Sequence, residues 1–300
     1  MNTATSNMIP LLSVTFPNLT IQNLVRITSG KAGEIYLANN QIIFKVALTT
    51  DTSHSNLVLE YDVLCVLQEK SDIPTPKPLY LGTLPDGRTV LGMSFISGVQ
   101  FTQEIYESFS LQDKDAFFSQ IGEFLCKIHN TPAMHIRGIS KWDSENNLVD
   151  FHKYYTTDVT NTLTPIEQLQ IQKITDNFLA ATKTNPIPMV LCHGDLHFWN
   201  LHYAPDTKKI CGILDFGIAC YNDPLNDIRY FWGDTATKIL ASYRGNIGKY
   251  PAERHLFYNI CNLIEEAHRE LSNGEVGFYV DNLKKAIFQE PLKISNRNFE

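Results

Sequence analysis

The residues best placed to do chemistry lie between 189 and 217, where two short apolar runs each end near a carboxylate. Asp195 follows the run MVLC and Asp215 follows the run ICGIL. The turn APDTKK between them predicts a hairpin that brings Asp215 back beside Asn200. Carboxylate and carboxamide oxygens that meet at strand ends suit Mg²⁺ and phosphates. Asp195 would remain to orient a hydroxyl nucleophile.

These residues have the spacing of a kinase catalytic segment. Asp195 ends a His-Gly-Asp triplet, and four residues separate it from Asn200. Asp215 begins an Asp-Phe-Gly triplet. Protein kinases carry H-R-D-x-x-x-x-N followed by D-F-G, in which the first aspartate is the base and the other two residues hold Mg²⁺. The segment therefore indicates phosphoryl transfer.

Zinc binding and disulfide formation are both disfavoured. His193, His197 and His202 have a spacing that would suit zinc on a helix, but the sequence around them predicts strand and loop. The cysteines form no C-x-x-C pair and stand mostly in apolar runs, which predicts buried, reduced thiols and a cytoplasmic location. They are Cys65, Cys126, Cys192, Cys211, Cys220 and Cys261.

Two charged residues upstream, Lys45 and Glu60, each stand in an apolar pattern and are predicted to pair with each other. Lys45 interrupts the apolar run IIFKVAL, and Glu60 lies on the apolar stripe of a helix predicted over 54–69. An inward-facing lysine and a buried carboxylate each need a partner. They therefore predict one ion pair, like the lysine and glutamate of a kinase nucleotide site. The alternative is that both side chains are exposed.

Two further segments would contact the nucleotide in a kinase. The turn SGKAGE, which contains Gly30, could place backbone N–H groups against phosphates, with a plain hairpin as the alternative. The segment GMSFISG would join the two lobes. Its backbone at Ser94 and Ile96 would bind adenine, with Met93 behind the base. A simple strand end is the alternative there.

The whole set resembles the aminoglycoside phosphotransferase and choline kinase-like family of small-molecule kinases, from about residue 24 to 235. The family's H-G-D-L-H-x-x-N stands here as HGDLHFWN, and its D-P-x-x-D runs from Asp223 to Asp227. Gly194 replaces the arginine of protein kinases and no A-P-E follows, which disfavours a kinase that acts on proteins. Phe198-Trp199 stands where the family commonly has Pro-Gly, and Ile218 where an acidic residue is common.

The resemblance implies a role for each residue. ATP or GTP and Mg²⁺ would be the cofactors, with Lys45 and Glu60 at the phosphates. Asp195 would be the catalytic base, and Asn200 and Asp215 the metal ligands. His193, Asp223 and Asp227 would be structural supports of the catalytic loop.

The elements predict an α+β, bilobal, protein-kinase-like fold. Residues 1–98 would form a nucleotide-binding lobe, with an antiparallel sheet that includes a hairpin at Asn39–Asn40 and one helix. Residues 99–300 would form a mainly helical lobe that binds the acceptor. Its helices are predicted over 110–129, 164–182, 224–242, 253–272 and 276–289. The polar stretch 131–163 is either an acceptor-binding insertion or a surface loop.

Composition restricts the partners. The chain has 300 residues and a formal net charge of −7, without the basic stripe of a nucleic-acid binder or an apolar run long enough to cross a membrane. Glu266 and Glu270, with Glu265, lie on the helix 253–272. They form either a wall for a cationic acceptor or a solvated face.

The acceptor is predicted to be a small hydroxyl compound, and charge complementarity alone favours one that carries positive charge. An aminoglycoside is the first candidate, followed by choline, ethanolamine, homoserine, fructosamine or another sugar. A non-catalytic nucleotide-binding module is the alternative from another class, although all of the catalytic-type residues are present.

Overall fold

The computed structural model describes residues 3–30, 33–48, 51–70, 72–132, 135–275 and 277–289. The chain divides into two compact units that are each discontinuous in sequence. The first unit contains Met1–Ser110, Thr131–Ile139 and Phe198–Ala219, and the second contains Leu111–Asn130, Ser140–His197 and Cys220–Glu300. The single boundary predicted near residue 98 does not describe this interleaving, because the hairpin after residue 197 packs within the first unit.

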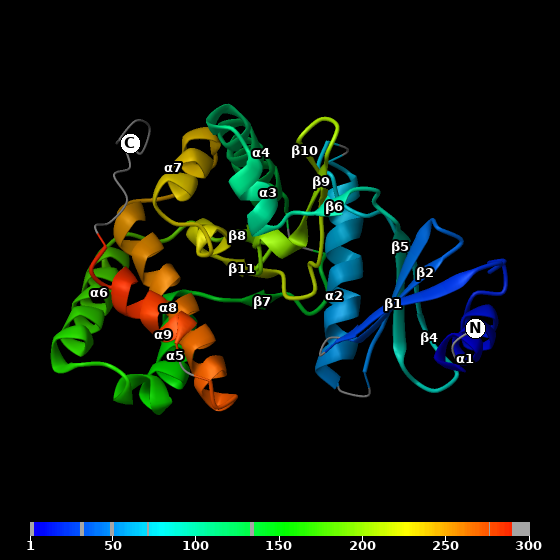
Figure 1. Cartoon of the computed structure of the whole chain (residues 1–300), viewed down its shortest axis with the longest axis horizontal. Helices are drawn as coiled ribbons and strands as arrows, with labels where there is room; N and C mark the ends of the chain where they lie inside the picture. The colour runs from blue at the N-terminus through cyan, green and yellow to red at the C-terminus, as the bar shows by residue number, and fades with distance from the viewer. Residues whose placement is uncertain are drawn as a thin grey trace. The chain divides into compact units, whose positions relative to one another are not determined.

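A five-stranded antiparallel sheet forms the centre of the first unit (Figure 1). The chain makes the predicted hairpin at Asn39 and Asn40, where both residues have positive φ angles of 53° and 55°. Asparagine tolerates this left-handed conformation better than most residues. In spatial order the strands are β1 (Leu24–Gly30), β2 (Gly33–Ala38), β3 (Ile42–Val46), β5 (Thr89–Ser94) and β4 (Pro78–Thr83).

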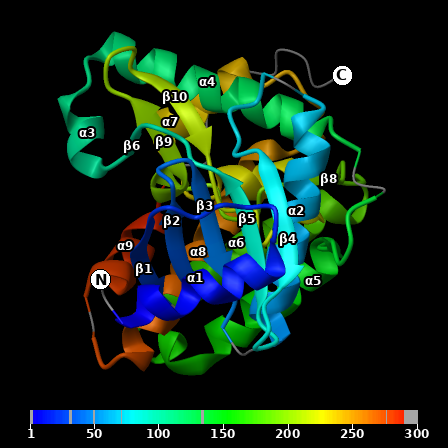
Figure 2. The ribbon, with the colours of Figure 1, turned by 90° about the vertical axis from the view of Figure 1, so that its right-hand side faces the viewer.

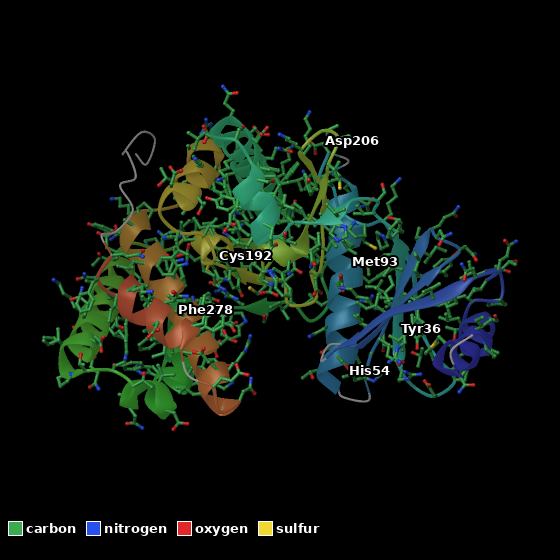
Figure 3. The ribbon with its side chains drawn as sticks, in the orientation of Figure 1. Tyr36, His54, Met93, Cys192, Asp206 and Phe278 are labelled. Atoms are coloured by element: carbon green, nitrogen blue, oxygen red, sulfur yellow. The ribbon has the colours of Figure 1, made fainter. Side chains whose placement is uncertain are left out.

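The two faces of this sheet carry different helices (Figure 2). One hydrophobic core joins α1 (Thr3–Thr15) to the side chains of Ile42, Phe44 and Val46 on β3. Lys45 alternates with them and therefore points to the opposite face, where α2 (Asp51–Gln68) lies against β4 and β5. Tyr36 belongs to the α1 side and is buried on β2 (Figure 3). Helix α1 lies outside the predicted elements, since Pro10 and a weak apolar pattern conceal it.

The rest of the first unit is a small three-stranded sheet in the order β10-β9-β6. Its aromatic core joins Phe101, Phe109 and Tyr203, whose ring centroids lie 5.6 to 5.9 Å apart, and Phe198 packs on Phe101 at 5.0 Å. The elements are β6 (Val99–Gln100), α3 (Gln103–Ser108), the 3₁₀ turn η2 (Phe198–Asn200), β9 (Leu201–Ala204) and β10 (Lys209–Ile213).

The second unit is mainly helical and is built around α8 (Pro251–Ser272), which contacts α5, α6 and α9. Phe257 of α8 stacks on Phe178 with ring centroids 3.9 Å apart. Three short strands, β7 (Ser140–Lys141), β11 (Cys220–Asn222) and β8 (Val190–Cys192), form its sheet. The other elements are α4 (Leu111–His129), α5 (Ser144–Tyr154), the π-turn η1 (Tyr155–Val159), α6 (Pro165–Lys183), η3 (Pro224–Ile228), α7 (Gly233–Ser242) and α9 (Phe278–Ala286).

Several sequence predictions can be compared with these elements. The helix predicted over 164–182 is present as α6, and Thr164 and Glu167 form a complete capping box at its start. The single helix predicted over 224–242 is wrong: the 3₁₀ turn η3 and helix α7 are separated, and Trp232 is extended between them. The stretch 131–163 contains α5 and η1 rather than only loop.

The six cysteines are free thiols, as predicted. Their burial is less complete than predicted, because only Cys192 and Cys220 are buried and Cys65 is exposed on α2. Among the helices in the described ranges, none has both the length and the apolarity that a bilayer crossing requires.

Candidate active site

A partly buried lysine in the first unit pairs with two carboxylates. The Nζ of Lys45 on β3 lies 2.8 Å from Oε1 of Glu60 and 2.9 Å from Oδ1 of Asp215. The side chain of Glu60 is 1% exposed, whereas that of Asp215 is 52% exposed. Burial by itself lowers the pKa of Lys45, but the two carboxylates raise it above its ordinary value. The lysine therefore stays charged and holds a solvent-facing carboxylate.

The hairpin predicted from the sequence brings Asn200 close to the residue before Asp215. Strands β9 and β10 pair antiparallel, and the N–H of Leu214 donates to the carbonyl of Asn200 at 2.9 Å. Asp215 has a φ of 68°, a left-handed conformation that is costly for a residue with a Cβ. Such strain is concentrated at functional sites.

The turn between β1 and β2 is only partly described. Gly30 pairs with Gly33, and residues 31 and 32 between them lie outside the described residues. The predicted phosphate contact of this turn falls largely on that gap. Gly33 has a φ of 141°, and a Cβ there would lie 2.4 Å from the carbonyl oxygen of Val46. Glycine is thus required where the turn meets β3.

The segment proposed to contact adenine is already hydrogen-bonded in part. The N–H of Ser94 donates to the carbonyl of Lys77 at 2.9 Å, and its hydroxyl accepts from the N–H of Lys77 at 2.8 Å. The backbone of Ile96 is hydrogen-bonded to the ring of His202, whose pKa is lowered by burial. Met93 is buried on β5 (Figure 3). An adenine contact at Ser94 and Ile96 stays a prediction.

Asp195 in the second unit is held by two side chains. The hydroxyl of Tyr230 donates to its Oδ1 at 2.7 Å, and Nε2 of His197 lies 3.4 Å from its Oδ2. Burial by itself raises the pKa of Asp195, but the hydrogen bonds from His197 and Tyr230 hold this pKa well below its usual range. Asp195 is therefore a carboxylate at neutral pH, as a base must be.

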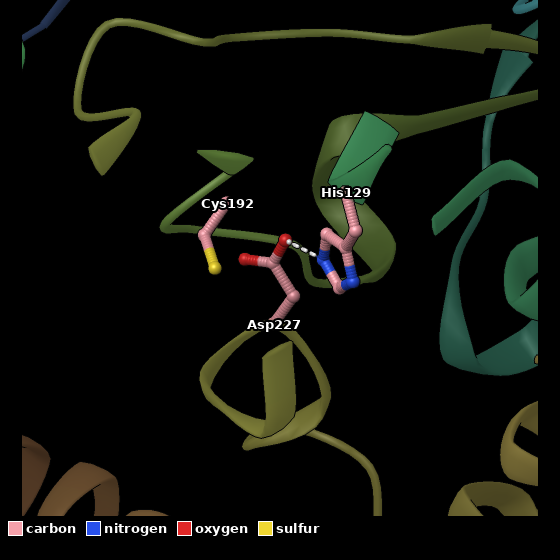
Figure 4. A group of neighbouring side chains, drawn as sticks. All are labelled: His129, Cys192 and Asp227. Carbon is pink, nitrogen blue, oxygen red and sulfur yellow. Dashed lines mark hydrogen bonds and ion pairs between the residues drawn. The ribbon is translucent and has the colours of Figure 1, made fainter. Parts of the chain in front are cut away.

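Asp227 holds the backbone just before Asp195 through hydrogen bonds. The N–H groups of His193 and Gly194 each donate to the Asp227 carboxylate at 2.8 Å. Nε2 of His129 lies 3.1 Å from the same carboxylate (Figure 4). His193 is fully buried, and its Nδ1 accepts from the N–H of Asp195 at 3.2 Å. These contacts fit the supporting roles predicted for His193 and Asp227.

Among the described residues, His129, Cys192 and Asp227 are the one group of three side chains close enough to hold a metal ion (Figure 4). Each has other partners: Nδ1 of His129 lies 2.8 Å from the Tyr243 hydroxyl, and the Cys192 thiol donates to the carbonyls of Asn222 and Asp223. Burial raises the pKa of Cys192, which opposes the thiolate that a metal needs. This group is a hydrogen-bonded brace.

Asp223 belongs to a buried ion pair with α8. Its Oδ2 lies 2.9 Å from Nε of Arg254 and accepts from the Tyr258 hydroxyl at 3.1 Å. The side chains of Asp223 and Arg254 are 1% and 2% exposed. Oδ1 of Asp223 also accepts from the N–H of Leu225 and so caps η3. The pair joins α8 to the segment that ends in Asp227.

The glutamates predicted to contact an acceptor have structural partners. The Glu270 carboxylate accepts from the backbone N–H groups of Phe278, Tyr279 and Val280, and therefore caps the first turn of α9. Glu265 and Glu266 both accept from Arg269. Burial raises the pKa of Glu266. A role for Glu266 and Glu270 in acceptor binding stays a prediction.

A cavity of about 50 Å³ with both polar and apolar lining residues lies among α5, η3 and α8. Asp150, Arg229, Asn262 and Glu265 are among the residues that line it. Asn262 is 8% exposed. Burial raises the pKa of Asp150. The cavity thus offers carboxylate and carboxamide groups to a small polar ligand.

Sequence reasoning missed Tyr230, Arg229, Asp150 and Asn262. Asn262 gave no usable signal, because in the predicted helix 253–272 it falls on the same side as the polar residues Asn259 and Glu266. Tyr230 gave none, since its contact with Asp195 depends on tertiary structure.

Comparisons with known proteins were made for the whole chain. A family model described as a phosphotransferase enzyme family matches residues 24–256. A probable acyl-CoA dehydrogenase, IBR3, of Arabidopsis thaliana is 23% identical over 182 residues, which cover 57% of this chain and 22% of that protein. Acyl-CoA dehydrogenase family member 10 of Mus musculus is 19% identical over 220 residues, 69% of this chain and 20% of that protein. The chain spans about a fifth of the length of these curated relatives.

Solved structures share the fold. The GDP complex of an aminoglycoside 2'-phosphotransferase-IIIa matches with a TM-score of 0.78 and 16% identity, over 96% of this chain and 97% of that one. A streptomycin and ATP complex of APH(2")-IIa matches with a TM-score of 0.68 and 19% identity, over 95% and 96%. The macrolide 2'-phosphotransferase MphH from Brachybacterium faecium matches with a TM-score of 0.64 and 16% identity, over 94% and 98%. The predicted α+β, protein-kinase-like fold is confirmed.

Proposed function

The chain belongs to the phosphotransferase enzyme family, and from this premise we propose that it transfers the γ-phosphoryl group of ATP or GTP to a hydroxyl group of a small molecule. The observation that carries the proposal is the position of Lys45, whose Nζ lies within 2.9 Å of both Glu60 and Asp215. A partly buried ammonium group fixed between two carboxylates, one of them exposed, suits the binding of nucleotide phosphates.

In this proposal Lys45 binds the α- and β-phosphates while Glu60 fixes its position. The GDP and ATP complexes among the matching structures support a nucleotide ligand. Contacts from Gly30 to the phosphates, and from Ser94 and Ile96 to the base, belong to the same proposal. Transfer of the phosphoryl group then depends on position and charge stabilisation more than on covalent chemistry of the protein.

The donor atoms of Asn200 and Asp215 fit Mg²⁺. A carboxylate and a carboxamide are the hard oxygen ligands that this ion prefers, and the exposed Asp215 carboxylate leaves room for water and phosphate ligands. Bound Mg²⁺ would neutralise charge on the phosphates. Asn200 and Asp215 are the residues of this chain that would hold it.

Asp195 acts as the catalytic base in the proposal. Its carboxylate accepts a hydrogen bond from the acceptor hydroxyl, turns the oxygen toward the phosphorus, and takes the proton as the new bond forms. Asp227 keeps the backbone of His193 and Gly194 in place beneath it. Asp223 anchors the same segment to α8 through Arg254.

We place a polar group of the acceptor in the cavity beside α8. Two carboxylates, Asp150 and Glu265, outnumber the one cation, Arg229, among the charged residues that line it and so favour a cationic ligand, and the carboxamide of Asn262 can offer a hydrogen bond. An amine of an aminoglycoside or an amino alcohol meets these requirements. Kanamycin and streptomycin complexes among the matching structures support an acceptor of this kind.

The experiment that tests the proposal is release of ADP or GDP with Mg²⁺ and ATP or GTP. A panel of aminoglycosides, macrolides, amino alcohols and sugars would supply the acceptor, and the Asp195→Asn variant would be the blank. Release that depends on one acceptor supports the kinase and identifies its substrate class. Nucleotide binding without turnover across a broad panel would instead favour a binding module.

Replacing Lys45 with Met should weaken nucleotide binding about 10- to 100-fold, because one charge-assisted hydrogen bond to phosphate is lost. Isothermal titration with the Mg²⁺-nucleotide measures the dissociation constant. Lys70→Met is the matched control, since Lys70 is an exposed lysine just beyond α2. Equal affinity of the Lys45 variant and this control would contradict the assignment.

Replacing Asp150 with Asn should raise the KM for a cationic acceptor about 10-fold or more and leave the nucleotide KM nearly unchanged, because a partly buried charge partner is removed. Steady-state kinetics with the acceptor found in the panel measure both constants. Asp158→Asn tests an exposed aspartate of the adjoining η1 turn and should change neither. A variant with an unchanged acceptor KM would exclude Asp150 from the acceptor site.

A further inference from the structure

We propose that Tyr230 is a positioning residue for the catalytic base, and that Arg229 sets the direction in which Tyr230 donates. The inference rests on the proposed function, because the base that it concerns is Asp195. Tyr230 lies between η3 and α7, three residues after Asp227. Its hydroxyl is 2.7 Å from Oδ1 of Asp195, a short distance typical of a hydrogen bond to a carboxylate.

The hydrogen-bond direction follows from Arg229. A guanidinium group only donates, and Nη2 of Arg229 donates to the Tyr230 oxygen at 3.1 Å. The phenol oxygen must accept in that contact, so its single proton is left for Asp195. Nη2 of Arg229 also donates to the carbonyl of Gly194 at 2.9 Å. Arg229 therefore ties Tyr230 to the backbone that carries Asp195.

Two further contacts, with Asn226 and with the ring of Tyr230, hold the guanidinium group of Arg229 in place. Its Nη1 donates to Oδ1 of Asn226 at 3.0 Å, and its guanidinium carbon lies 5.0 Å from the centre of the Tyr230 ring. Burial lowers the pKa of Arg229, but Tyr230 and the carboxylates of Glu265 and Asp195 raise it, so the group stays charged. The donor direction is thus fixed by a permanent cation.

A second group fixes the other carboxylate oxygen. Nε2 of His197 lies 3.4 Å from Oδ2 of Asp195, and the His197 ring meets the Tyr230 ring edge-on, at 5.3 Å between centroids. With partners on both oxygens the carboxylate cannot rotate freely. A base that is oriented before the acceptor binds needs no reorganisation during the reaction.

The same arginine reaches the proposed acceptor pocket. Arg229 lines the cavity together with Asp150 and Glu265, so it contacts both the acceptor side and the group that holds the base. Burial raises the pKa of Tyr230, although the nearby charge of Arg229 lowers it. Tyr230 therefore keeps its proton throughout the working pH range and acts as a donor, not as the base.

Tyr230→Phe removes the hydroxyl and keeps the ring, which makes it the variant to measure. We expect kcat to fall about 10- to 100-fold, as for one lost hydrogen bond to a charged group, with the nucleotide KM within about twofold of wild type. The acid limb of the kcat profile should move to higher pH. Loss of the donor raises the pKa of Asp195, so protonation removes the base at a less acidic pH.

The readout is ADP or GDP release, with the acceptor identified in the panel and also with water as the acceptor. Arg229→Lys keeps the charge, loses the planar fork, and should give a smaller fall in kcat in the same direction. Tyr221→Phe is the control. Tyr221 lies on β11 of the same unit, and its hydroxyl has no hydrogen bond to the described residues. Its kcat and acid limb should match those of the wild type.

Two results would overturn the inference while the proposed function stands. One is wild-type kcat with an unmoved acid limb in Tyr230→Phe. The other is a parallel loss of folding, nucleotide affinity and turnover, again with an unmoved acid limb, which would indicate a merely structural role. If wild type releases no more nucleotide diphosphate than Asp195→Asn with any acceptor, water included, the proposed function itself fails and the inference fails with it.

Discussion

Turnover should fall about 10²- to 10⁴-fold when Asp195 is replaced by Asn, while nucleotide affinity changes little. The carboxamide has nearly the shape of the carboxylate, and its oxygen can still accept the hydrogen bond from Tyr230. The substitution therefore leaves the loop in place but removes the group that accepts the proton. Single-turnover release of ADP or GDP measures the chemical step, and isothermal titration measures the nucleotide affinity.

The matched control for this prediction is Asp206→Asn, in the exposed turn between β9 and β10 (Figure 3). It makes the same chemical change away from Asp195 and should leave turnover within about twofold, as surface substitutions usually do.

The pKa of Asp195 also predicts how the turnover of the wild type depends on pH. Because the pKa of Asp195 is held below its usual range, the wild-type base stays ionised as pH falls through the ordinary carboxyl range. Wild-type turnover in Asp195→Asn would exclude it as the base.

The contact between Lys45 and Glu60 was within reach of sequence analysis because it follows from two periodicities. In a strand, the residue next to Phe44 must face the opposite side, and a carboxylate on a helical apolar stripe must face the sheet. Both rules are local, and the ion pair at 2.8 Å satisfies both. The proximity of Asn200 to Leu214 follows in the same way from a short hairpin.

Other features depend on packing between segments that no local pattern connects. The sequence shows glutamates along one helix, but it cannot show that the first N–H groups of α9 meet the carboxylate of Glu270. The predicted helix 224–242 is divided by a segment in which the side chains of Arg229 and Tyr230 turn toward Gly194 and Asp195. There, tertiary hydrogen bonds replace the helical ones that propensity alone favours.

The largest loss of stability is expected at the buried ion pair between Asp223 and Arg254. Arg254→Met should lower the free energy of unfolding by about 3–5 kcal/mol, because it leaves the Asp223 carboxylate buried without its charged partner. The same change removes the donor to the carbonyls of Lys249 and Ile247, just before α8. Urea denaturation of the full chain, followed by circular dichroism, measures the difference.

Arg269→Gln provides the comparison on the same helix, since Arg269 is 58% exposed and pairs with Glu265 and Glu266 at the surface. Because water solvates the exposed guanidinium of Arg269, this pair should contribute at most about 1 kcal/mol, although the side chains of Glu265 and Glu266 are only 28% and 22% exposed. Both variants remove one arginine charge from α8, so the difference between their losses in unfolding free energy reports the effect of burial. Asp223→Asn should also destabilise, by exchanging the charged acceptor of Arg254 and Tyr258 for a neutral one. Equal losses in Arg254→Met and Arg269→Gln would mean that the ion pair does not anchor η3 to α8, and the support proposed for the catalytic loop through Asp223 would have to be abandoned.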